Sequence, residues 1–350
     1  MSEPSPTPQR LAAVIILNWN AGGHLRRCVE SVASTVPPGT RVVLVDNASS
    51  DASVEAAVRA VPTLEVVRNL TNLGFAGAYN RAIADAPEPY AMLLNPDTVA
   101  LRAGWLEDAL AVAQADPAVA EVACKLVFAH DPSRLNSAGG MAFWFTGPVD
   151  LGFGEPSEGP ERTRGAPFAA SGGAMLVRRD AFLAAGGFDE RMFAFVEDVD
   201  LGWRLRLDGL KVAYASHVVF QHAFSSTLGP VSPRKFYLTH RNWLRAMLKN
   251  YRRSTLAAAL PAFAAWTAVK SAGALVSERS LALAVQPLRA VGWNLSVLAD
   301  TLKERRKVQG TRRVGDAEIR AAMGPRAFEP FASLRLRQRL AHEVAGGGGP

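Results

Sequence analysis

Several features that define other classes of protein are missing from this sequence. Its two cysteines, Cys28 and Cys124, lack CxxC spacing, so neither a disulfide framework nor a zinc site is expected, and a reducing cytoplasm fits. Residues 1–11 show no basic segment followed by an apolar one, so we expect a short disordered leader rather than a secretory signal. No GxGxxG fingerprint is present, which gives a nicotinamide enzyme little support.

Acidic residues are absent from one long segment. Residues 209–277 contain nine Lys/Arg and no Asp/Glu, and residues 301–340 contain eleven Lys/Arg against four acids. Residues 1–208 are acidic, with 17 Lys/Arg against 25 Asp/Glu. The basic part therefore faces an anionic partner. Nucleic acid and anionic lipid are both candidates, but the basic stretches flank apolar segments and carry no nucleic-acid motif, so we expect an anionic membrane surface and no nucleic acid.

The order of apolar runs predicts the fold class. Strands are expected at residues 12–17, 41–45, 64–68, 90–94, 174–178, 212–215 and 218–220, and helices at 22–36, 51–60, 74–84, 179–185 and 198–207. Alternating elements of this length predict an α/β fold with a doubly wound, mostly parallel sheet flanked by helices. We expect this domain to span residues 12–250, with a helical, basic region at 251–343 and a flexible, glycine-rich tail at 344–350.

Polar side chains follow the first two predicted strands. Asn18 and Asn20 come after the first, and Asp46 and Asn47 after the second. A carboxylate at a strand end can accept hydrogen bonds from a ribose or a base, while the next helix N-terminus favours anions. Capping of that helix is an equally good explanation for Asp51.

Two further clusters follow later strands. In the first, Asn72 and Gly74 precede Asn80 and Arg81, where glycine permits close approach of a ligand and the polar side chains can reach a base or a phosphate. In the second, Asn95-Pro96-Asp97 ends a buried strand. The Asp97 carboxylate suits a hard divalent ion, although Asn-Pro-Asp is also good turn chemistry.

A fourth cluster carries the acid–base chemistry. Glu197 and Asp198 open a predicted helix, and Asp200 follows them. Three carboxylates at a helix N-terminus have a structural explanation, because they complement the helix dipole. A positioned carboxylate also serves as a general base, which contributes roughly 10²–10⁴-fold to removal of a proton from a hydroxyl.

Taken together, these motifs resemble those of the family 2 glycosyltransferases with the GT-A fold, most closely a rhamnosyl- and galactofuranosyltransferase-like branch. The matching segments are VIILNWN, VLVDNASSD, NLGFAGAYNRAI, LLNPDT, SGGAMLVRRDAF and EDVDLGWRLRLDG, in this order over about residues 12–250. The resemblance implies that Asp46 contacts the nucleoside, Asp97 and His222 hold a divalent metal, Mg²⁺ or Mn²⁺, and Asp198 is the base. Glu197 orients the acceptor or supports the base. The resemblance also makes Gly172, Gly173, Trp203 and Arg241 candidate substrate-binding residues. Asn95 is a further candidate, and it stands where many relatives have Asp.

The function implied by the resemblance is an inverting, metal-dependent transfer of a sugar from a nucleoside diphosphate sugar, dTDP-rhamnose or a UDP-sugar. The acceptor would be a hydroxyl of a glycan or lipid-linked saccharide in cell-envelope polysaccharide synthesis. A non-catalytic nucleotide-sugar-binding scaffold on the same fold is the alternative. A nucleotidyltransferase would need a Gly-rich basic loop near the N-terminus, which Gly22-Gly23 with Arg26-Arg27 hardly supplies. A homo-oligomer remains open.

Two apolar stretches lie in the basic part of the chain, at residues 256–276 and 281–299. They are rich in Ala and interrupted by Pro261, Lys270 and Arg289, so they are marginal as membrane spans. Interfacial helices, a shallow hairpin and ordinary packed helices are all compatible with this pattern. We expect interfacial helices, and hence a cytoplasmic protein at the inner face of the cell membrane.

Overall fold

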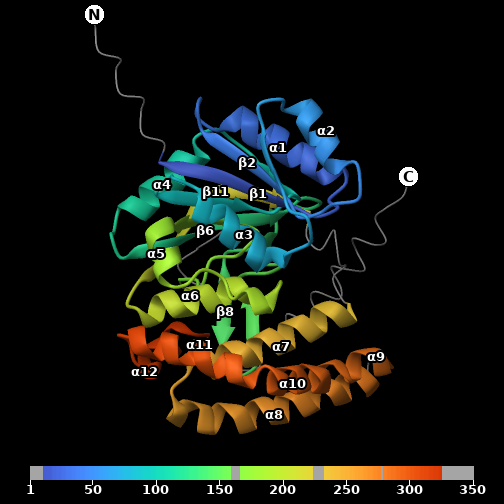
Figure 1. The fold of residues 1–350 in the computed structure, drawn as a ribbon, viewed down its shortest axis with the longest axis vertical. Coiled ribbons are helices and arrows are strands. Elements are labelled where there is room, and N and C mark those ends of the chain that lie inside the picture. The colour runs from blue at the N-terminus through green and yellow to red at the C-terminus, as the bar shows by residue number, and fades with distance from the viewer. Residues whose placement is uncertain (1–10, 159–165, 224–231, 277–278, 325–350) are drawn as a thin grey trace, which may run out of the picture.

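The computed structural model describes residues 11–158, 166–223, 232–276 and 279–324. Within them, a central sheet carries helices on both faces, and a separate layer of helices lies beyond α6, at the bottom of Figure 1. The predicted leader at 1–10 and the tail at 344–350 fall outside the described residues.

The main sheet has the order β3-β2-β1-β4-β10-β6-β11-β5, with β7 paired to β6. Its strands are β1 (Ala12–Asn18), β2 (Arg41–Asp46), β3 (Glu65–Arg68), β4 (Tyr90–Leu94), β5 (Thr98–Ala100), β6 (Val119–Phe128), β7 (Leu135–Ser137), β10 (Ala174–Arg178) and β11 (Lys211–His222). A small hairpin of β8 (Gly140–Phe143) and β9 (Gly147–Asp150) stands apart from it.

The sheet is more mixed than the sequence predicted. The first four strands in this order are parallel neighbours, as expected. β10 then runs antiparallel between β4 and β6, and β5 antiparallel to β11. The strands predicted at 212–215 and 218–220 are the single strand β11, whose pairing with β6 shifts register between Ala215 and Val219.

Helices cover the two faces because strand side chains alternate. Val14 and Ile16 of β1 enter one core with Leu25 and Val29 of α1, whereas Ile15 enters the other. The covering helices are α1 (Gly23–Thr35), α2 (Ser53–Ala60) and α4 (Trp105–Gln114) on the first face, and α3 (Gly74–Asp85), α5 (Arg179–Ala184) and α6 (Glu197–Leu207) on the second. The predicted doubly wound α/β arrangement is confirmed.

The helical layer, our name for α7–α12, packs against a third core. Its elements are α7 (Pro233–Asn250), α8 (Arg253–Val276), α9 (Leu281–Ala284), α10 (Gln286–Ser296), α11 (Leu298–Thr311) and α12 (Asp316–Ala322). Trp243 and Met247 of α7 meet Trp203 of α6 and Phe263 of α8 in this core. α7 was predicted within the catalytic domain, yet it packs extensively on α10 and α11.

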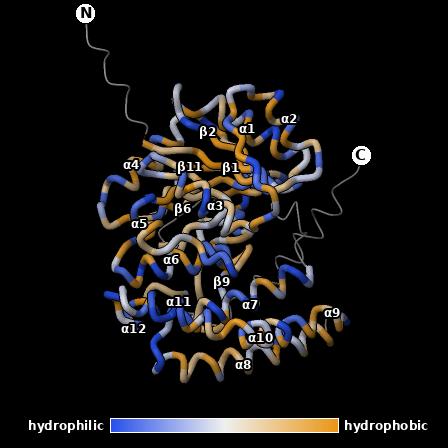
Figure 2. The backbone as a smooth tube through the Cα atoms, viewed as in Figure 1, coloured by the Kyte–Doolittle hydropathy of each residue, from blue (hydrophilic) through white to orange (hydrophobic). Residues whose placement is uncertain are grey.

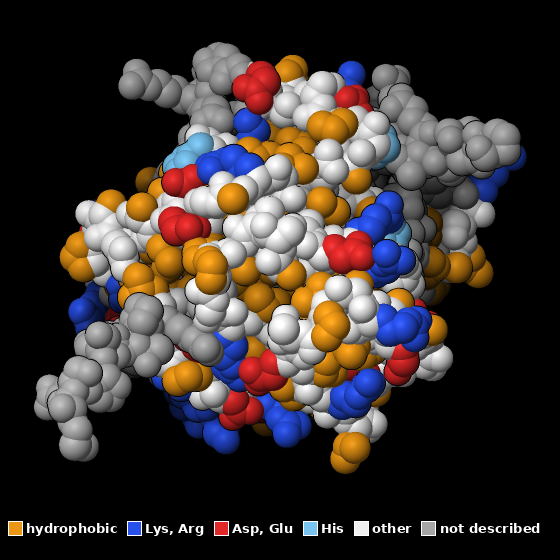
Figure 3. Space-filling view, turned by 90° about the horizontal axis from the view of Figure 1, so that it is seen from above, with side chains coloured by type: hydrophobic (Ala, Val, Ile, Leu, Met, Phe, Trp, Pro, Cys, Tyr) orange, Lys and Arg blue, Asp and Glu red, His pale blue; other side chains and the backbone are white. Residues whose placement is uncertain are grey.

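The outermost helix of the layer is α8, which Figure 2 shows largely in apolar colours. It is long and apolar enough to cross a membrane, and α9–α10 with α11, bent by 73°, pass the same test together. Length and composition alone are weak evidence for a span. However, only 28% of the most apolar stretch of α8 is buried, so α8 is not an ordinary core helix. The opposite side of the molecule, seen from above, carries acidic, basic and apolar side chains interspersed (Figure 3).

Candidate active site

Two adjoining cavities lie beyond the carboxyl ends of β1, β2 and β4. The first is lined by residues that follow these strands, including Trp19, Asn47 and Asp97, and the second by the start of α6, including Asp198. The residues that line both are Phe75, Asn95, Ala194, Phe195, His222 and Lys235. A doubly wound sheet binds ligands at this edge, so the shared lining marks one continuous site.

Amide side chains shape the first cavity. They hydrogen-bond to neighbouring loops and do not extend into the open space. The Asn47 side chain donates to the Asn72 Oδ1 (2.9 Å) and to the Gly74 carbonyl (3.1 Å). Gly74 has φ +73°, and a Cβ there would lie 2.4 Å from the Phe193 carbonyl oxygen, so only glycine fits. These three predicted residues therefore form the wall of the cavity where the resemblance places the nucleotide.

Asp97 and His222 meet in the first cavity, and His222 also lines the second. The antiparallel pairing of β11 with β5 aligns His222 with Thr98, and the His222 Nε2 lies 3.2 Å from the Asp97 Oδ1. The Nδ1 of His222 lies 2.8 Å from the Asn136 Oδ1. An amide oxygen can only accept, so this contact assigns the proton to Nδ1 and leaves Nε2 facing the carboxylate.

This pair fits a divalent cation. Burial disfavours the charged imidazole, but the Asp97 carboxylate outweighs burial and raises the pKa of His222. A cation placed between Nε2 and the carboxylate would satisfy both groups, with Asn136 fixing the ring as second-shell partners of metal-bound histidines do. No cluster of three or more His, Cys, Asp or Glu suited to a metal occurs among the described residues. The ligand set would thus be completed by Asn95, water or a diphosphate.

Asp198 stands on the wall of the second cavity, held by backbone on both oxygens. Its Oδ2 accepts from the Gly172 N–H (2.9 Å) and its Oδ1 from the Val199 N–H (2.8 Å). Burial raises the pKa of Asp198 to about 6, against the effect of these two bonds. The carboxylate is therefore fixed in orientation and is a better proton acceptor than an ordinary Asp, while it stays mostly ionised at neutral pH.

Glu197 also lines the second cavity, but the environment of its carboxyl group differs from that of Asp198. Burial, followed by repulsion from Asp198 and Asp200, raises the pKa of Glu197 well above its usual range. Its Oε2 is buried and makes no hydrogen bond within the described part of the chain. Its environment thus favours the protonated form more than that of Asp198 does.

Gly172 and Gly173 connect the base to the metal pair. A Cβ on Gly172 would lie 3.5 Å from the Asp198 Oδ2, and one on Gly173 would lie 3.6 Å from the His222 Cε1. With neighbouring Cα atoms 3.8 Å apart, the carboxylate and the imidazole are at most about 14 Å apart. The same Cβ atoms would approach Phe75 to 2.8 Å and Leu126 to 2.7 Å, so neither position has room for a side chain. Asp198 and His222 therefore lie close enough to act on one ligand, and both line the second cavity.

The loop before Asp198 is strained and held from the helical layer. Phe193, Phe195 and Val196 have φ of 65°, 70° and 74°, which costs a non-glycine residue of the order of 1–3 kcal/mol each. The buried Asn242 side chain of α7 hydrogen-bonds the carbonyl oxygens of Met192 (2.9 Å), Ala194 (3.0 Å) and Phe195 (2.7 Å). Asn242 therefore maintains the conformation that sets the start of α6.

Seven predicted substrate-binding residues line neither cavity, and four of them, Asn80, Arg81, Trp203 and Arg241, make their contacts elsewhere. Asn80 exchanges hydrogen bonds with the Phe188 backbone, and Arg81 reaches Asn69 (3.5 Å). Both lie about two turns beyond the start of α3, whose first turn alone meets the site. Trp203 is fully buried, because five residues of α6 rotate it about 140° away from Asp198. Arg241 hydrogen-bonds the carbonyls of Arg191 and Met192 and stacks on Trp293, 4.2 Å from the ring centroid.

The polar residues after β1 and β2 hydrogen-bond to one another. Asn18 donates to Ser49 and Ser53 (both 2.9 Å) and more weakly to Asp46 (3.5 Å), while Asn20 accepts from the Ser50 N–H (2.7 Å). Asp46 is 4% exposed and adjoins Asn47, which lines the first cavity. The structure thus places Asp46 at the edge of the site, where its contact with a nucleoside stays a prediction.

Three residues of the site were not predicted. Asn136 fixes His222, Asp150 of β9 lines the second cavity, and Lys235 lines both cavities. Asp150 also raises the pKa of Asp198, after burial. Asn136 and Asp150 come from the Gly- and Pro-rich stretch after β6, which has no periodicity to place them, and Lys235 lies among many other basic residues.

The fold and the site define a glycosyltransferase. Residues 13–183 match the family model Glycosyl transferase family 2, and residues 163–320 match Glycosyl transferase family 21. An N-acetylglucosaminyl-diphospho-decaprenol L-rhamnosyltransferase from Mycobacterium tuberculosis is 32% identical over 283 residues, which are 70% of this chain and 90% of the relative. The chain belongs to the family 2 glycosyltransferases, on the rhamnosyltransferase-like branch.

Solved structures share the fold. GalNAc-T7 with UDP, GalNAc and Mn²⁺ superposes with a TM-score of 0.54 at 16% identity, covering 71% of this chain and 49% of that chain. A mannosyltransferase from Pyrobaculum calidifontis in complex with GDP-Man and Mn²⁺ gives 0.50 at 18% identity, covering 88% of each chain. The predicted GT-A fold is thereby confirmed.

Proposed function

We propose that this enzyme transfers a sugar from dTDP-rhamnose or a UDP-sugar, with inversion, to a hydroxyl of a lipid-linked saccharide in cell-envelope polysaccharide synthesis. The observation that carries the proposal is the placement of Asp198 on one wall of a continuous site and of Asp97 with His222 on the other. The rhamnosyltransferase relative, which the name describes as acting on an N-acetylglucosaminyl-diphospho-decaprenol, supports this donor and acceptor class.

In this mechanism the acceptor hydroxyl enters the second cavity. Asp198 takes its proton as the oxygen attacks the anomeric carbon, because the carboxylate is ionised and fixed by the Gly172 and Val199 N–H groups. Glu197, beside Asp198 in the same cavity, orients the acceptor or supports the base. A single displacement, with the base on one side of the sugar and the diphosphate on the other, would invert the anomeric centre.

The donor diphosphate lies in the first cavity. A divalent ion held by Asp97 and His222, with Asn95 beside them, supplies charge that stabilises the leaving group when it is bound. Lys235 at the start of α7 adds a cation that lines both cavities. This lining supports a donor in the first cavity and an acceptor in the second.

The test is a panel of nucleoside diphosphates and nucleotide sugars, with and without Mg²⁺ or Mn²⁺. Thermal shift identifies the base and the metal, and product analysis with a GlcNAc-diphospho-lipid acceptor then tests transfer and anomeric configuration. Metal-dependent binding without transfer or donor hydrolysis would instead favour a nucleotide-sugar-binding scaffold.

We also infer a peripheral position at the cytoplasmic face of the cell membrane. The exposed residues of α8 between Ala257 and Val276 are all Ala, Pro, Val, Gly or Leu, and we call them the outer face of α8. Leu281, Leu288 and Leu295, seven residues apart, are each about two-thirds exposed on α9 and α10. So much contiguous apolar surface beside basic residues is typical of interfacial helices.

Co-sedimentation with anionic vesicles, and release by salt, tests this position. Wild-type protein that stays in the supernatant with vesicles at low salt would contradict it. Transfer to a soluble acceptor analogue is independent of the outcome, so the enzymatic proposal is tested separately.

A further inference from the structure

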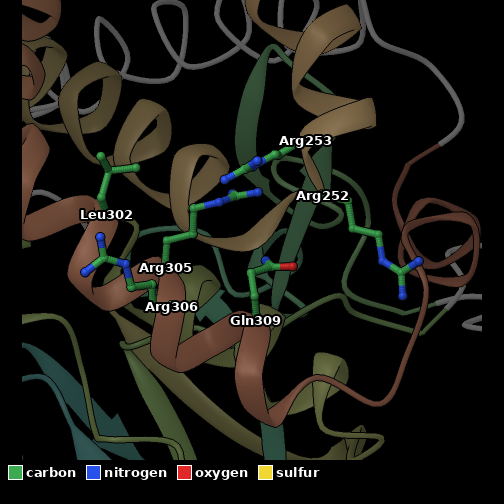
Figure 4. A pocket seen from close by; sticks show the side chains of 6 residues that line it. All are labelled: Arg252, Arg253, Leu302, Arg305, Arg306 and Gln309. Atoms are coloured by element: carbon green, nitrogen blue, oxygen red, sulfur yellow. The ribbon is translucent and has the colours of Figure 1, made fainter.

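A second basic site lies at the far end of α7, away from the catalytic cavities. Its cavity is lined by Arg252 and Arg253 at the start of α8 and by Leu302, Arg305, Arg306 and Gln309 of α11 (Figure 4). These α11 residues recur at intervals of three or four, so one face of that helix lines the cavity. No acidic side chain is among the lining residues that the structure describes.

The cations in this cavity are brought together without compensation. In Figure 4 the guanidinium groups of Arg253 and Arg305 point toward each other, while Arg252 extends away from them. Arg305 is fixed, since its Nη1 donates to the carbonyl oxygens of Leu248 and Tyr251 (both 2.6 Å). Burial, and then repulsion by Arg253 and Arg312, lowers the pKa of Arg305.

Three further arginines line the cavity, and no acidic side chain pairs with them. Among the described residues, Arg252, Arg253 and Arg306 make no salt bridge, whereas the nearby Arg312 is paired with Asp316. Asp316 also accepts a hydrogen bond from the Arg252 N–H (2.8 Å) at the start of α8, so this acid is already occupied by the backbone and by Arg312. Several uncompensated positive charges in one hollow favour an anion, and a phosphate suits arginine geometry best.

This anion is not the substrate of the reaction. Lys235, in the third position of α7, lines the catalytic cavities, and Arg252 lies just past the end of that 18-residue helix. Thr239 is the residue of α7 nearest to Arg252 among those lining the catalytic cavities, and the 13 residues between these positions span about 20 Å of helix. A diphosphate attached to a sugar in the catalytic site cannot reach that far, so the arginines serve a different ligand.

The surroundings indicate an amphiphilic ligand. Leu302 lines the cavity and is 42% exposed, and Leu295 and Leu298 continue the apolar surface from it toward the outer face of α8. A headgroup phosphate among the arginines would place its acyl chains along these leucines.

We infer that this cavity, lined by Arg253, Arg305 and Arg306, binds the headgroup phosphate of an anionic phospholipid. The inference rests on the membrane position proposed above and gives it a specific contact. Such a contact orients the outer face of α8 against the bilayer and fixes the height of the catalytic site above it.

The test compares two double variants that remove the same charge from the layer. Arg253→Gln/Arg306→Gln changes the cavity, whereas Lys303→Gln/Lys307→Gln changes other faces of α11. Binding is measured by co-sedimentation with vesicles of phosphatidylcholine containing phosphatidylglycerol, and with phosphatidylcholine alone. Because the cavity variant loses charge-assisted contacts with the phosphate that the control variant keeps, it should bind phosphatidylglycerol vesicles at least about 10-fold more weakly.

The control variant should lose clearly less, and neither should change binding to phosphatidylcholine alone. An equal loss in both variants would show a diffuse electrostatic effect and overturn the site. Saturation of the cavity by glycerol phosphate, with no vesicle dependence, would show a free-phosphate site and overturn the lipid. Tighter binding of an oligonucleotide duplex than of vesicles at the same salt concentration would also overturn the lipid as the ligand.

Transfer to a soluble acceptor separates this inference from the proposed function. The cavity variant should retain wild-type turnover there, because no residue of the catalytic cavities is altered. A protein that shows the vesicle difference but transfers no sugar would refute the proposed function and leave the lipid site standing.

Discussion

The catalytic α/β domain and the helical layer distribute polarity in opposite ways. Helix α1 buries Leu25 and Val29 and exposes Arg26 and Arg27, as a helix on a water-soluble domain does. Helix α8 exposes an entirely apolar outer face. An enzyme that only worked in water would have no reason to differ in this way between its two parts.

Buried ion pairs join the layer to the catalytic domain beside their shared apolar core. Arg245 of α7 is 1% exposed and pairs with Asp189 (2.7 Å) and Asp300 (2.8 Å), while Lys249 pairs with Asp189 (2.5 Å) and Asp200 (2.9 Å). Asp189 and Asp200 flank the strained loop before Asp198. These charges therefore fasten the layer to the candidate active site, whereas the outer face of α8 stays apolar.

The largest effect is expected in the catalytic domain. Asp198→Asn should lower turnover by roughly 10²–10⁴-fold, because the amide cannot accept the proton. Nucleoside diphosphate binding, measured by calorimetry, should stay unchanged, since Asp198 lines only the second cavity. Asp85→Asn, on the exposed end of α3, is the control and should behave like wild type. Near-normal turnover of the Asp198 variant would remove it as the base.

The acid limb of the pH profile tests the same group. Because burial raises the pKa of Asp198 to about 6, the fraction of ionised base should fall below that pH. Turnover should then drop about tenfold per pH unit, with no such step near pH 4, where an ordinary Asp titrates. A profile flat down to pH 4.5 would show that another group accepts the proton.

Metal binding by Asp97 and His222 should depend on the hydrogen bond from His222 to Asn136. Asn136→Ala frees the His222 ring and should weaken Mn²⁺ binding by about 10–100-fold, as second-shell losses do. The readout is the Mn²⁺ concentration needed to raise the melting temperature in the presence of a nucleoside diphosphate. Ser133→Ala, in the same stretch but exposed, should leave this concentration unchanged. Equal metal dependence in both variants would contradict the role of Asn136.

Asn242 connects the helical layer to the loop before Asp198, and the effect of this connection should be measurable. Asn242→Ala leaves three loop carbonyls without their donor and should cost about 1–3 kcal/mol in the free energy of unfolding, together with a fall in kcat. Asn294→Ala also removes a buried amide, but one that holds α10 to the Arg241 carbonyl. That variant should lose stability with little change in kcat. If the two variants lost kcat equally, α7 would not act through the loop.

The smallest effect on stability is expected on the outer face of α8. Ala265→Glu should change the free energy of unfolding by less than about 0.5 kcal/mol, because the site is exposed. It should nevertheless weaken binding to anionic vesicles, since it puts a negative charge on the surface that meets lipid. Ala84→Glu on exposed α3 provides the matched control, with no effect on either measurement. A strongly destabilised Ala265 variant would show that this face is packed in the folded protein.

Much of the fold could be predicted because local patterns decide it. The strands at 12–18 and 41–46 are uninterrupted apolar runs, and helix α1 ends where Pro37 follows an extended Val36. By contrast, β6 was not predicted. All ten of its residues are buried, but Glu121 and Lys125 interrupt the apolar run, and only the packed sheet compensates for burying them.

The candidate site also contains residues that local chemistry predicted and residues that it could not predict. The motif residues Asp97, Glu197, Asp198 and His222 were found because their chemistry is unusual at strand and helix ends. Trp203 and Arg241 were assigned wrongly because a motif gives spacing along a helix but not the direction in which each side chain points. Asn242 was given no role from the sequence, since it holds a strained loop nearly fifty residues earlier.

The sequence by itself determined the order of elements, the candidates for acid–base and metal-binding groups, and the accumulation of positive charge toward the C-terminus. These are properties of short segments, set by side-chain chemistry and periodicity. The tertiary structure alone decided which of these groups share a cavity, which amides hold loops, and that the arginines of α8 and α11 converge at the far end of α7 from the catalytic cavities. Such convergence depends on how helices pack on one another, and no local pattern encodes that packing.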